Sequence, residues 1–312
     1  MKLKKILLYG GIITVGLSSI HLYKENKFEK EVVKHSYFSM NHNGSVIAHR
    51  GFSSVEIENS KNATTRGFES QCSDGVEIDV RISNDNEVVL SHNNYVSGLG
   101  KIEECTIEEI KATNNSLDKL SKLQMIKDIF KNVDGKLVFD RYKEVSKKEE
   151  ELITLDDVLG INTDKTLIID LKFDDDNYEN LYNKVNDILT NYDGNINIIL
   201  QSDNYEYLDE MKNLYPNYDY QLIIAKRHDL EYLDSDFDAF CIRKNLITKK
   251  ITKKLLKQNK KISIWTVNSY EDFYILYNKL DELIYKTYII TDYPDEICYL
   301  LNEDKILKKK NK

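Results

Sequence analysis

Short apolar runs alternate with longer amphipathic stretches along most of the chain from residue 45 onward. The runs are rich in Val, Ile and Leu, and near-continuous apolar strands of this kind belong to parallel sheets that helices cover on both faces. The pattern predicts eight strands, at residues 46–49, 76–82, 167–172, 196–201, 221–225, 239–242, 262–267 and 288–291. Eight strand–helix units predict an α/β fold of the TIM (β/α)8 barrel type. An open doubly wound sheet is the rival, but no glycine-rich nucleotide loop follows the first predicted strand.

One interval breaks this alternation. After an extended segment at residues 87–90, no further barrel strand is predicted before residue 167. The interval is too long for a simple connection, and residues 106–112 and 120–130 within it have helical patterns. We therefore predict a small helical insertion after the second strand, at about residues 95–165, over one mouth of the barrel.

Residues 1–23 have the pattern of a targeting segment. Lys2, Lys4 and Lys5 precede an apolar run. A positively charged start before an apolar run is typical of an uncleaved membrane anchor with its N-terminus inside or, as the second choice, of a cleaved signal peptide. A buried helix of the soluble domain is a third interpretation. The first predicts a single-pass protein of the cell membrane with the rest of the chain outside, and the second predicts a secreted protein.

The remaining chain divides into three predicted segments. Residues 24–44 are polar and charged and read as a tether, whereas the barrel, with its insertion, extends over residues 45–301. Residues 302–312 form a lysine-rich basic tail, which we interpret as a solvated end of the chain, with contact to an anionic surface as the alternative.

The composition narrows the class of partner. The 312 residues carry a net charge of −8, which argues against a nucleic-acid partner because such proteins normally have a basic surplus. The negative net charge does not exclude an anionic substrate, because a bound divalent cation reverses the local sign of a site.

The spacing of the four cysteines predicts neither a zinc site nor a disulfide framework. They are widely spaced and form no CxxC pair: Cys72, Cys105, Cys241 and Cys298.

Two pairs of charged residues lie near the carboxyl ends of predicted strands, where barrel enzymes have their active sites. Glu77 and Asp79 are two positions apart in one strand, so their side chains point to the same face. Inward carboxylates are costly unless compensated, and a hard divalent cation compensates them through oxygen ligands. Asp170 and Lys172 repeat the spacing on another strand. One pair alone would read as strand-end charges in solvent, but two pairs favour a functional site.

Two histidines bracket the first of these pairs. His49 ends the first predicted strand and is followed by Arg50, and His92 follows the extended segment. Phosphodiester cleavage needs one group that takes a proton and one that gives a proton, and histidine titrates in the right range for both. Arg50 offers a fork for phosphate oxygens. The other histidines, to which we assign no role, are His21, His35, His42 and His228.

Taken together, these segments resemble the N-terminal signature of glycerophosphodiester phosphodiesterases. The signature consists of Val-Ile-Ala-His-Arg-Gly at 46–51, Glu-Asn-Ser at 58–60, Asp-Gly-Val-Glu-Ile-Asp-Val at 74–80 and Val-Val-Leu-Ser-His at 88–92. Later segments are also similar to the family, at residues 154–159, 262–268 and 290–294. The resemblance covers nearly the whole of residues 45–301.

The resemblance implies a TIM barrel with an insertion after the second strand, and hydrolysis of glycerophosphodiesters to glycerol 3-phosphate and an alcohol. It implies one divalent ion, Ca²⁺ or Mg²⁺, and a set of site residues. These are the acid/base pair His49 and His92, the phosphate ligands Arg50 and Lys172, the metal ligands Glu77, Asp79 and Asp170, and the pocket residue Trp265, for which core packing is the alternative.

The chain departs from the family at two positions. Asp170 stands where the family usually has Glu, and the shorter side chain raises the question of whether it reaches the metal directly. Asn93 stands where the family usually has Asp, next to His92. Both catalytic histidines are kept, so activity is expected.

The natural substrate stays open between three alternatives, and the class of function stays open between two. An outward-facing enzyme would meet lipid head-group diesters, lysophospholipids (a lysophospholipase-D-like activity) or envelope polymers such as teichoic acid and capsule glycerophosphate. A non-catalytic envelope protein that uses the barrel as a binding scaffold is the alternative of a different class.

Overall fold

The computed structural model describes residues 44–96, 98–112, 153–173 and 177–310, with side chains up to Asn302. Eight parallel strands form a closed barrel in these parts of the chain. They are β1 (Ser45–His49), β2 (Gly75–Ile82), β6 (Thr166–Leu171), β7 (Asn197–Ser202), β8 (Asp219–Ile224), β9 (Ala239–Arg243), β10 (Lys261–Trp265) and β11 (Tyr288–Thr291). The order around the sheet is β1-β11-β10-β9-β8-β7-β6-β2, and β1 also pairs with β2, which closes the barrel. The predicted barrel and its eight strands are confirmed, with small shifts at the strand ends.

The two faces of each strand explain why these apolar runs fold in this way. Alternate residues point to opposite sides of a strand, so one set fills the barrel and the other packs beneath the helices. The interior set forms one buried cluster, made of Ile47, Ile168, Ile199, Ile223, Cys241 and Ile290. Trp265 is partly buried and packs against this cluster. The four cysteines, Cys241 among them, are free thiols.

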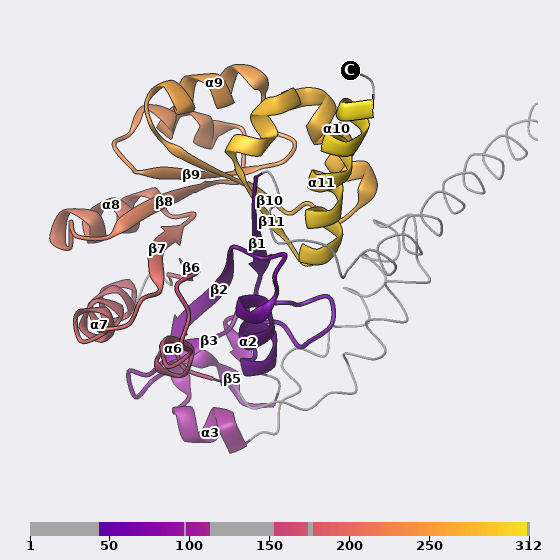
Figure 1. Ribbon diagram of the computed structural model, residues 1–312. Coiled ribbons are helices and arrows are strands. Elements are labelled where there is room, and N and C mark those ends of the chain that lie inside the picture. Colours follow the sequence, from indigo (N-terminus) through magenta and orange to yellow (C-terminus); the bar gives the residue numbers. More distant parts are fainter. Residues whose placement is uncertain (1–43, 97, 113–152, 174–176, 311–312) are drawn as a thin grey trace, which may run out of the picture. The chain divides into compact units, whose positions relative to one another are not determined.

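Helices lie around the outside of the barrel (Figure 1). They are α2 (Lys61–Glu69), α6 (Leu155–Leu159), α7 (Tyr178–Thr190), α8 (Tyr205–Leu214), α9 (Lys249–Lys257), α10 (Tyr270–Leu280) and α11 (Pro294–Lys310). Short 3₁₀ segments, η2 (His228–Asp234) and η3 (Asp281–Lys286), complete the connections before β9 and β11. Side-chain caps start several helices: Ser60 accepts from the Ala63 N–H at α2, and Thr154 forms a capping box with Asp157 at α6.

The described part of the insertion after β2 begins with β3 (Val88–Leu90), which runs antiparallel to β2. The predicted extended segment at 87–90 is therefore a strand. A hairpin of β4 (Tyr95–Val96) and β5 (Gly100–Lys101) follows, then η1 (Ile102–Glu104) and α3 (Ile107–Ala112), which agrees with the predicted helix at 106–112. A small apolar cluster holds this part together: Val89, Val96, Ile102, Cys105 and Ile110. The predicted helix at 120–130 lies outside the described residues.

The prediction for the N-terminal end falls outside the described residues, whereas the prediction for the C-terminal end can be compared with the structure. Residues 1–43, which include the predicted targeting segment and nearly all of the tether, lie outside the described residues. None of the helices that the structure describes combines the length and apolar character that a bilayer crossing requires. At the other end, α11 continues to Lys310 and so includes most of the segment that we assigned to the basic tail.

Candidate functional site

The candidate site lies at the carboxyl end of the barrel, where strand register places polar side chains side by side. In the pairing of β1 with β2, His49 is the partner of Glu77. In the pairing of β2 with β6, Asp79 is the partner of Asp170. Lys172 directly follows the last residue of β6. Two strand pairs thus bring a histidine, three carboxylates and an ammonium group to one end of the barrel.

The three carboxylates form a tight, buried cluster. Glu77, Asp79 and Asp170 are only 2%, 1% and 4% exposed. Each offers an oxygen that lies within 4.8 Å of the oxygens of the other two, so Asp170 reaches the cluster despite its shorter side chain. Oδ1 of Asp170 is buried and has no hydrogen-bond partner among the described residues. A buried acceptor without a partner is costly, and three oxygens at this spacing suit a hard divalent cation. The residues therefore fit such an ion.

Burial also changes the charge state of these groups when no cation is bound. Desolvation, with repulsion from Asp79, raises the pKa of Glu77 to about 7. Desolvation raises the pKa of Asp170 to about 6, although Lys172 opposes the shift. Asp79 behaves differently: burial works against its charge, but Arg50 and Lys172 outweigh burial and hold its pKa well below the usual range. Asp79 is thus the fixed anion of the cluster.

Two cations neutralise Asp79. The Lys172 ammonium lies 3.0 Å from Asp79 Oδ1 and 2.6 Å from Asp170 Oδ2. The Arg50 Nε lies 3.0 Å from Asp79 Oδ2, but its N–H has no hydrogen-bond acceptor among the described residues, so this contact is an ion pair without a hydrogen bond. The other end of the guanidinium donates from Nη1 to Glu58 Oε1 at 2.8 Å. Arg50 and Lys172 therefore present positive charge beside the carboxylate cluster.

Asn59 orients Asp79 from the loop before α2. Its Nδ2 donates to Asp79 Oδ2 at 2.9 Å, and its Oδ1 accepts from the Asp79 backbone N–H at 3.0 Å. Asn59 has a φ of 57°, a left-handed conformation that asparagine tolerates better than most residues. Its own N–H donates to the Arg50 carbonyl at 2.9 Å. One asparagine thus connects the Arg50 turn to the carboxylate.

His49 is held by an acid from the last strand. Its Nδ1 lies 2.6 Å from Asp292 Oδ1, and its Nε2 lies 3.9 Å from Glu77 Oε2. The other oxygen of Asp292 accepts from the Asn268 amide, which fixes the carboxylate. Burial opposes the charge of the imidazolium, but Asp292 and, less strongly, Glu77 outweigh it, so the pKa of His49 is raised.

His92 lies in a different electrostatic environment. It follows β3, its carbonyl accepts from the guanidinium of Arg81 at 2.9 Å, and its Nδ1 lies 3.1 Å from Asn93 Oδ1. Desolvation and the positive charges of Arg50 and Lys172 lower the pKa of His92, with Asp79 opposing them. The two histidines therefore flank one charged cluster with pKa values shifted in opposite directions.

Trp265 ends β10 at the same end of the barrel. Its Nε1 donates to the Cys241 carbonyl at 3.2 Å, and its ring packs on the interior cluster. The side chain is half-buried, so it both covers the core and faces the mouth.

Glu58, Asn59 and Asp292 were not among the predicted site residues, although all three lie within the family motifs. Asp292 directly follows β11, so the rule that strand ends carry the site would have found it. Asn59 follows no strand, and only its contact with Asp79 identifies it.

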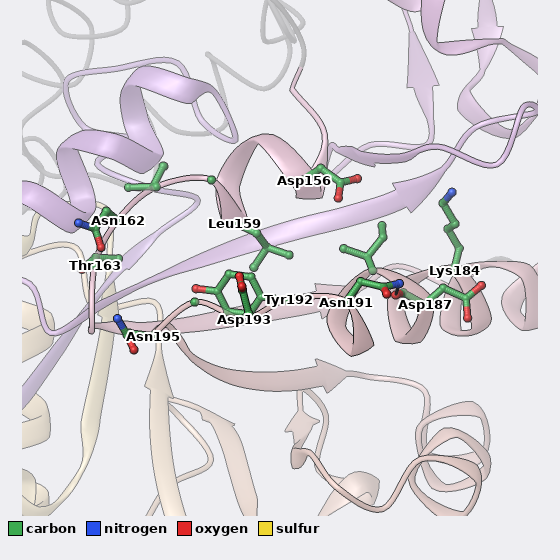
Figure 2. Close-up of a pocket in the computed structure, with 14 residues that line it drawn as sticks. Asp156, Leu159, Asn162, Thr163, Lys184, Asp187, Asn191, Tyr192, Asp193 and Asn195 are labelled. Carbon is green, nitrogen blue, oxygen red and sulfur yellow. Dashed lines mark hydrogen bonds between the residues drawn. The ribbon is translucent and has the colours of Figure 1, made fainter.

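The described residues also line a cavity of about 580 Å³ that lies away from this site. It is lined by the segments that lead into β6 and β7 and by parts of α6 and α7, including Asp156, Lys184 and Tyr192 (Figure 2). These segments precede the strands, so the cavity lies at the amino end of the barrel. It has no part in the cluster described above.

Comparisons with known proteins agree with the fold and the motifs. The model of the glycerophosphoryl diester phosphodiesterase family matches residues 49–296. An uncharacterized protein of Mycoplasma genitalium is 25% identical over 236 residues, which cover 73% of this chain and 88% of that protein.

Solved structures share the barrel. A phosphodiesterase of Oleispira antarctica in complex with the product sn-glycerol-3-phosphate has a TM-score of 0.60 at 21% identity, covering 83% of this chain and 96% of that chain. A glycerophosphodiester phosphodiesterase of Thermotoga maritima has a TM-score of 0.59 at 21% identity, covering 83% of this chain and 99% of that chain.

Proposed function

This chain belongs to the glycerophosphoryl diester phosphodiesterase family, and we propose that it hydrolyses glycerophosphodiesters to glycerol 3-phosphate and an alcohol with the help of a divalent cation and two histidines. The enzyme class, a phosphoric diester hydrolase, follows from the family. The product of the Oleispira antarctica relative, sn-glycerol-3-phosphate, supports the same product here. The further elements of the proposal rest on the residues of the site.

The observation that carries the proposal is the unpartnered Oδ1 of Asp170 inside a buried carboxylate cluster. We propose that Glu77, Asp79 and Asp170 hold Ca²⁺ or Mg²⁺. When bound, such an ion supplies positive charge that stabilises phosphate oxygens. Arg50 and Lys172 lie against the same cluster and would bind the phosphate oxygens from the protein side.

The two histidines would carry the proton transfers. One takes the proton of the attacking hydroxyl, either the neighbouring glycerol hydroxyl or water, and the other gives a proton to the leaving alcohol. If the glycerol hydroxyl attacks, water then opens the cyclic phosphate. Asp292 supports this role for His49, because its contact with Nδ1 leaves Nε2 free to exchange a proton.

One assay tests the proposal as a whole. Glycerophosphocholine, glycerophosphoglycerol and a lysophospholipid are offered to the wild type with and without chelator, and to His49→Ala. The matched control is His228→Ala, an exposed histidine of η2. We expect chelation and His49→Ala each to lower turnover by at least about a hundredfold, the usual scale of acid/base catalysis, and the control to leave it unchanged. The metal-binding and histidine roles are wrong if turnover survives both changes.

We further propose that residues 1–23 anchor the protein in the cell membrane, residues 24–44 form a tether, and the barrel faces outward. The support is the run of lysines before an apolar segment. Added protease should then remove the barrel from intact cells while cytoplasmic markers stay whole. Release of the protein into the medium with a new N-terminus would instead identify a cleaved signal peptide.

A further inference from the structure

Three cations at the carboxyl end of the barrel have no side-chain partner among the residues that the structure describes. Lys226 and Arg227 follow β8, and Arg243 ends β9; we call them the basic rim. All three are exposed, and their side chains make no ion pair or hydrogen bond within the described part of the chain. The nearby Lys244, in contrast, pairs with Asp272 at 2.6 Å. The carboxylate of Asp229 lies next to them, but it accepts from the backbone N–H groups of Ala225 and Lys226 and not from these side chains.

The strand alternation places Arg243 on the inner side of the mouth. Cys241, two residues earlier, belongs to the cluster inside the barrel, and positions two apart point to the same face. Lys244 points the other way, because it pairs with Asp272 of α10. Arg243 is also the register partner of Trp265 on β10. A guanidinium therefore stands beside Trp265, facing the opening.

The barrel order sets Arg243 of the basic rim across the mouth from Glu77 and Asp79, while Lys226 and Arg227 follow the neighbouring strand β8. Going from β2 to β9, the strands between are β6, β7 and β8 in one direction, and β1, β11 and β10 in the other. Three strands lie on each side, so Arg243 on β9 is opposite Asp79 on β2. A phosphate held at the cluster would leave the rest of the substrate to extend toward the basic rim.

We propose that the basic rim binds a second phosphate on the leaving alcohol, so that the preferred substrate is a glycerophosphate chain with at least two phosphodiesters. The inference rests on the proposed function, because it places the reacting phosphate at the carboxylate cluster. Guanidinium groups bind phosphate through paired hydrogen bonds, and Lys226 adds a further charge. A neutral or cationic leaving group, as in glycerophosphocholine, makes no such contact.

Kinetics with one-phosphate and two-phosphate substrates test this inference. Glycerophosphoglycerol is compared with the same compound extended by one glycerophosphate unit. The rim variant replaces Lys226, Arg227 and Arg243 by Gln. The matched control replaces by Gln three exposed lysines of α9 that have no ion pair among the described residues: Lys250, Lys253 and Lys257. Both variants lose three charges.

We expect kcat/KM of the wild type to favour the two-phosphate compound by about tenfold, equivalent to about 1.4 kcal/mol. The rim variant should lose this preference and keep the turnover of glycerophosphoglycerol within about twofold, and the control should keep both. The preference should also weaken as ionic strength rises to about 0.15 M and beyond. An unchanged preference in the rim variant overturns the inference and leaves the proposed function intact.

A binding measurement separates the inference from the activity. Trp265 is the single tryptophan of the chain, so its fluorescence reports on ligand beside Arg243. The two-phosphate compound is titrated into His49→Ala, with and without the three rim changes. We expect the rim changes to weaken Kd by about tenfold. That result supports the basic rim even if no substrate is turned over, in which case only the proposed function fails. If the rim changes abolish binding to anionic phosphatidylglycerol vesicles but leave this Kd unchanged, the rim is a membrane contact and the inference is wrong.

Discussion

His49 Nδ1 lies 2.6 Å from Asp292 Oδ1, although 243 positions separate the two residues in the chain. The contact exists because the last strand pairs with the first, as Ala48 with Thr291. A carboxylate in contact with one imidazole nitrogen fixes the tautomer and favours the charged ring. Closure of the barrel thereby sets the chemistry of a residue in its first strand.

Asp292→Asn tests this relationship through the pH dependence of kcat/KM. Burial disfavours the charged form of His49, and Asp292 is the main group that outweighs it and raises the pKa. Without that charge, the pKa of His49 falls. A plot of kcat/KM against pH rises along an acidic limb and falls along an alkaline limb. The limb that His49 controls must then move to lower pH: the alkaline limb if His49 is the acid, and the acidic limb if it is the base. The limb that moves identifies the role.

The control for this experiment is Asp295→Asn, at the start of α11. Asp295 accepts from the Ser70 hydroxyl at 3.2 Å and has no contact with His49, so neither limb should move. Two limbs that stay in place in Asp292→Asn would contradict a proton-transfer role for His49.

Asn59→Gly isolates the side chain that orients Asp79. Glycine adopts the φ of 57° at this position without strain, so the change removes the amide and leaves the backbone undisturbed. Asp79 loses a 2.9 Å hydrogen bond to its buried carboxylate. We expect the free energy of unfolding to fall by about 1–3 kcal/mol, together with kcat/KM, as measured by urea denaturation and steady-state assay.

Asn86→Gly provides the comparison for Asn59→Gly. Asn86 has a φ of 60° but is exposed in the turn between β2 and β3. We expect its replacement to change stability by less than about 0.5 kcal/mol and activity not at all. Equal effects of the two substitutions would mean that the backbone conformation, and not the contact with Asp79, explains the result.

Gly51→Ala tests why a glycine follows the His-Arg pair. Gly51 has a φ of 78°, and a Cβ there would lie 2.4 Å from the carbonyl carbon of Ala63 in α2. The backbone of α2 cannot move aside without a large energetic cost. We therefore expect the free energy of unfolding, measured by thermal or urea unfolding, to fall by more than about 1 kcal/mol. Gly98→Ala has a comparable φ of 88°, and none of the described residues lies within 4 Å of the added Cβ, so it separates conformational strain from the clash. If both lose the same stability, the close approach to α2 is unimportant.

The sequence predicted the strands well because burial leaves a direct trace in it. A run such as Ile198–Leu200 is apolar since the barrel interior lies on one side and helices lie on the other, so every position is selected for burial. The same logic identified Glu77 and Asp79, because two carboxylates inside an apolar run are costly to bury unless something compensates their charge.

Contacts between distant segments left no such trace. Asp292 is one acid among many until β11 pairs with β1 and brings it to His49. Asn59 lies in a loop without periodicity, and its contact with Asp79 depends on a left-handed backbone that the sequence does not specify. The basic rim depends on strand order as well, because only the closed barrel sets β9 opposite β2.

Glu77→Gln tests the metal site through stability. Desolvation and Asp79 raise the pKa of Glu77 from 4.5 to about 7 without metal, so the folded state holds a proton that the unfolded state releases. The stability of the metal-free wild type should therefore fall as pH rises through that window, and Glu77→Gln should lose this part of the decline. With Ca²⁺ or Mg²⁺ added, the Tm should rise in the wild type and in the control Glu58→Gln but not in Glu77→Gln. Calorimetry between about pH 5 and 8, with and without chelator, measures both effects. A Glu77→Gln protein whose Tm rises with metal as much as the wild type would exclude Glu77 as a ligand.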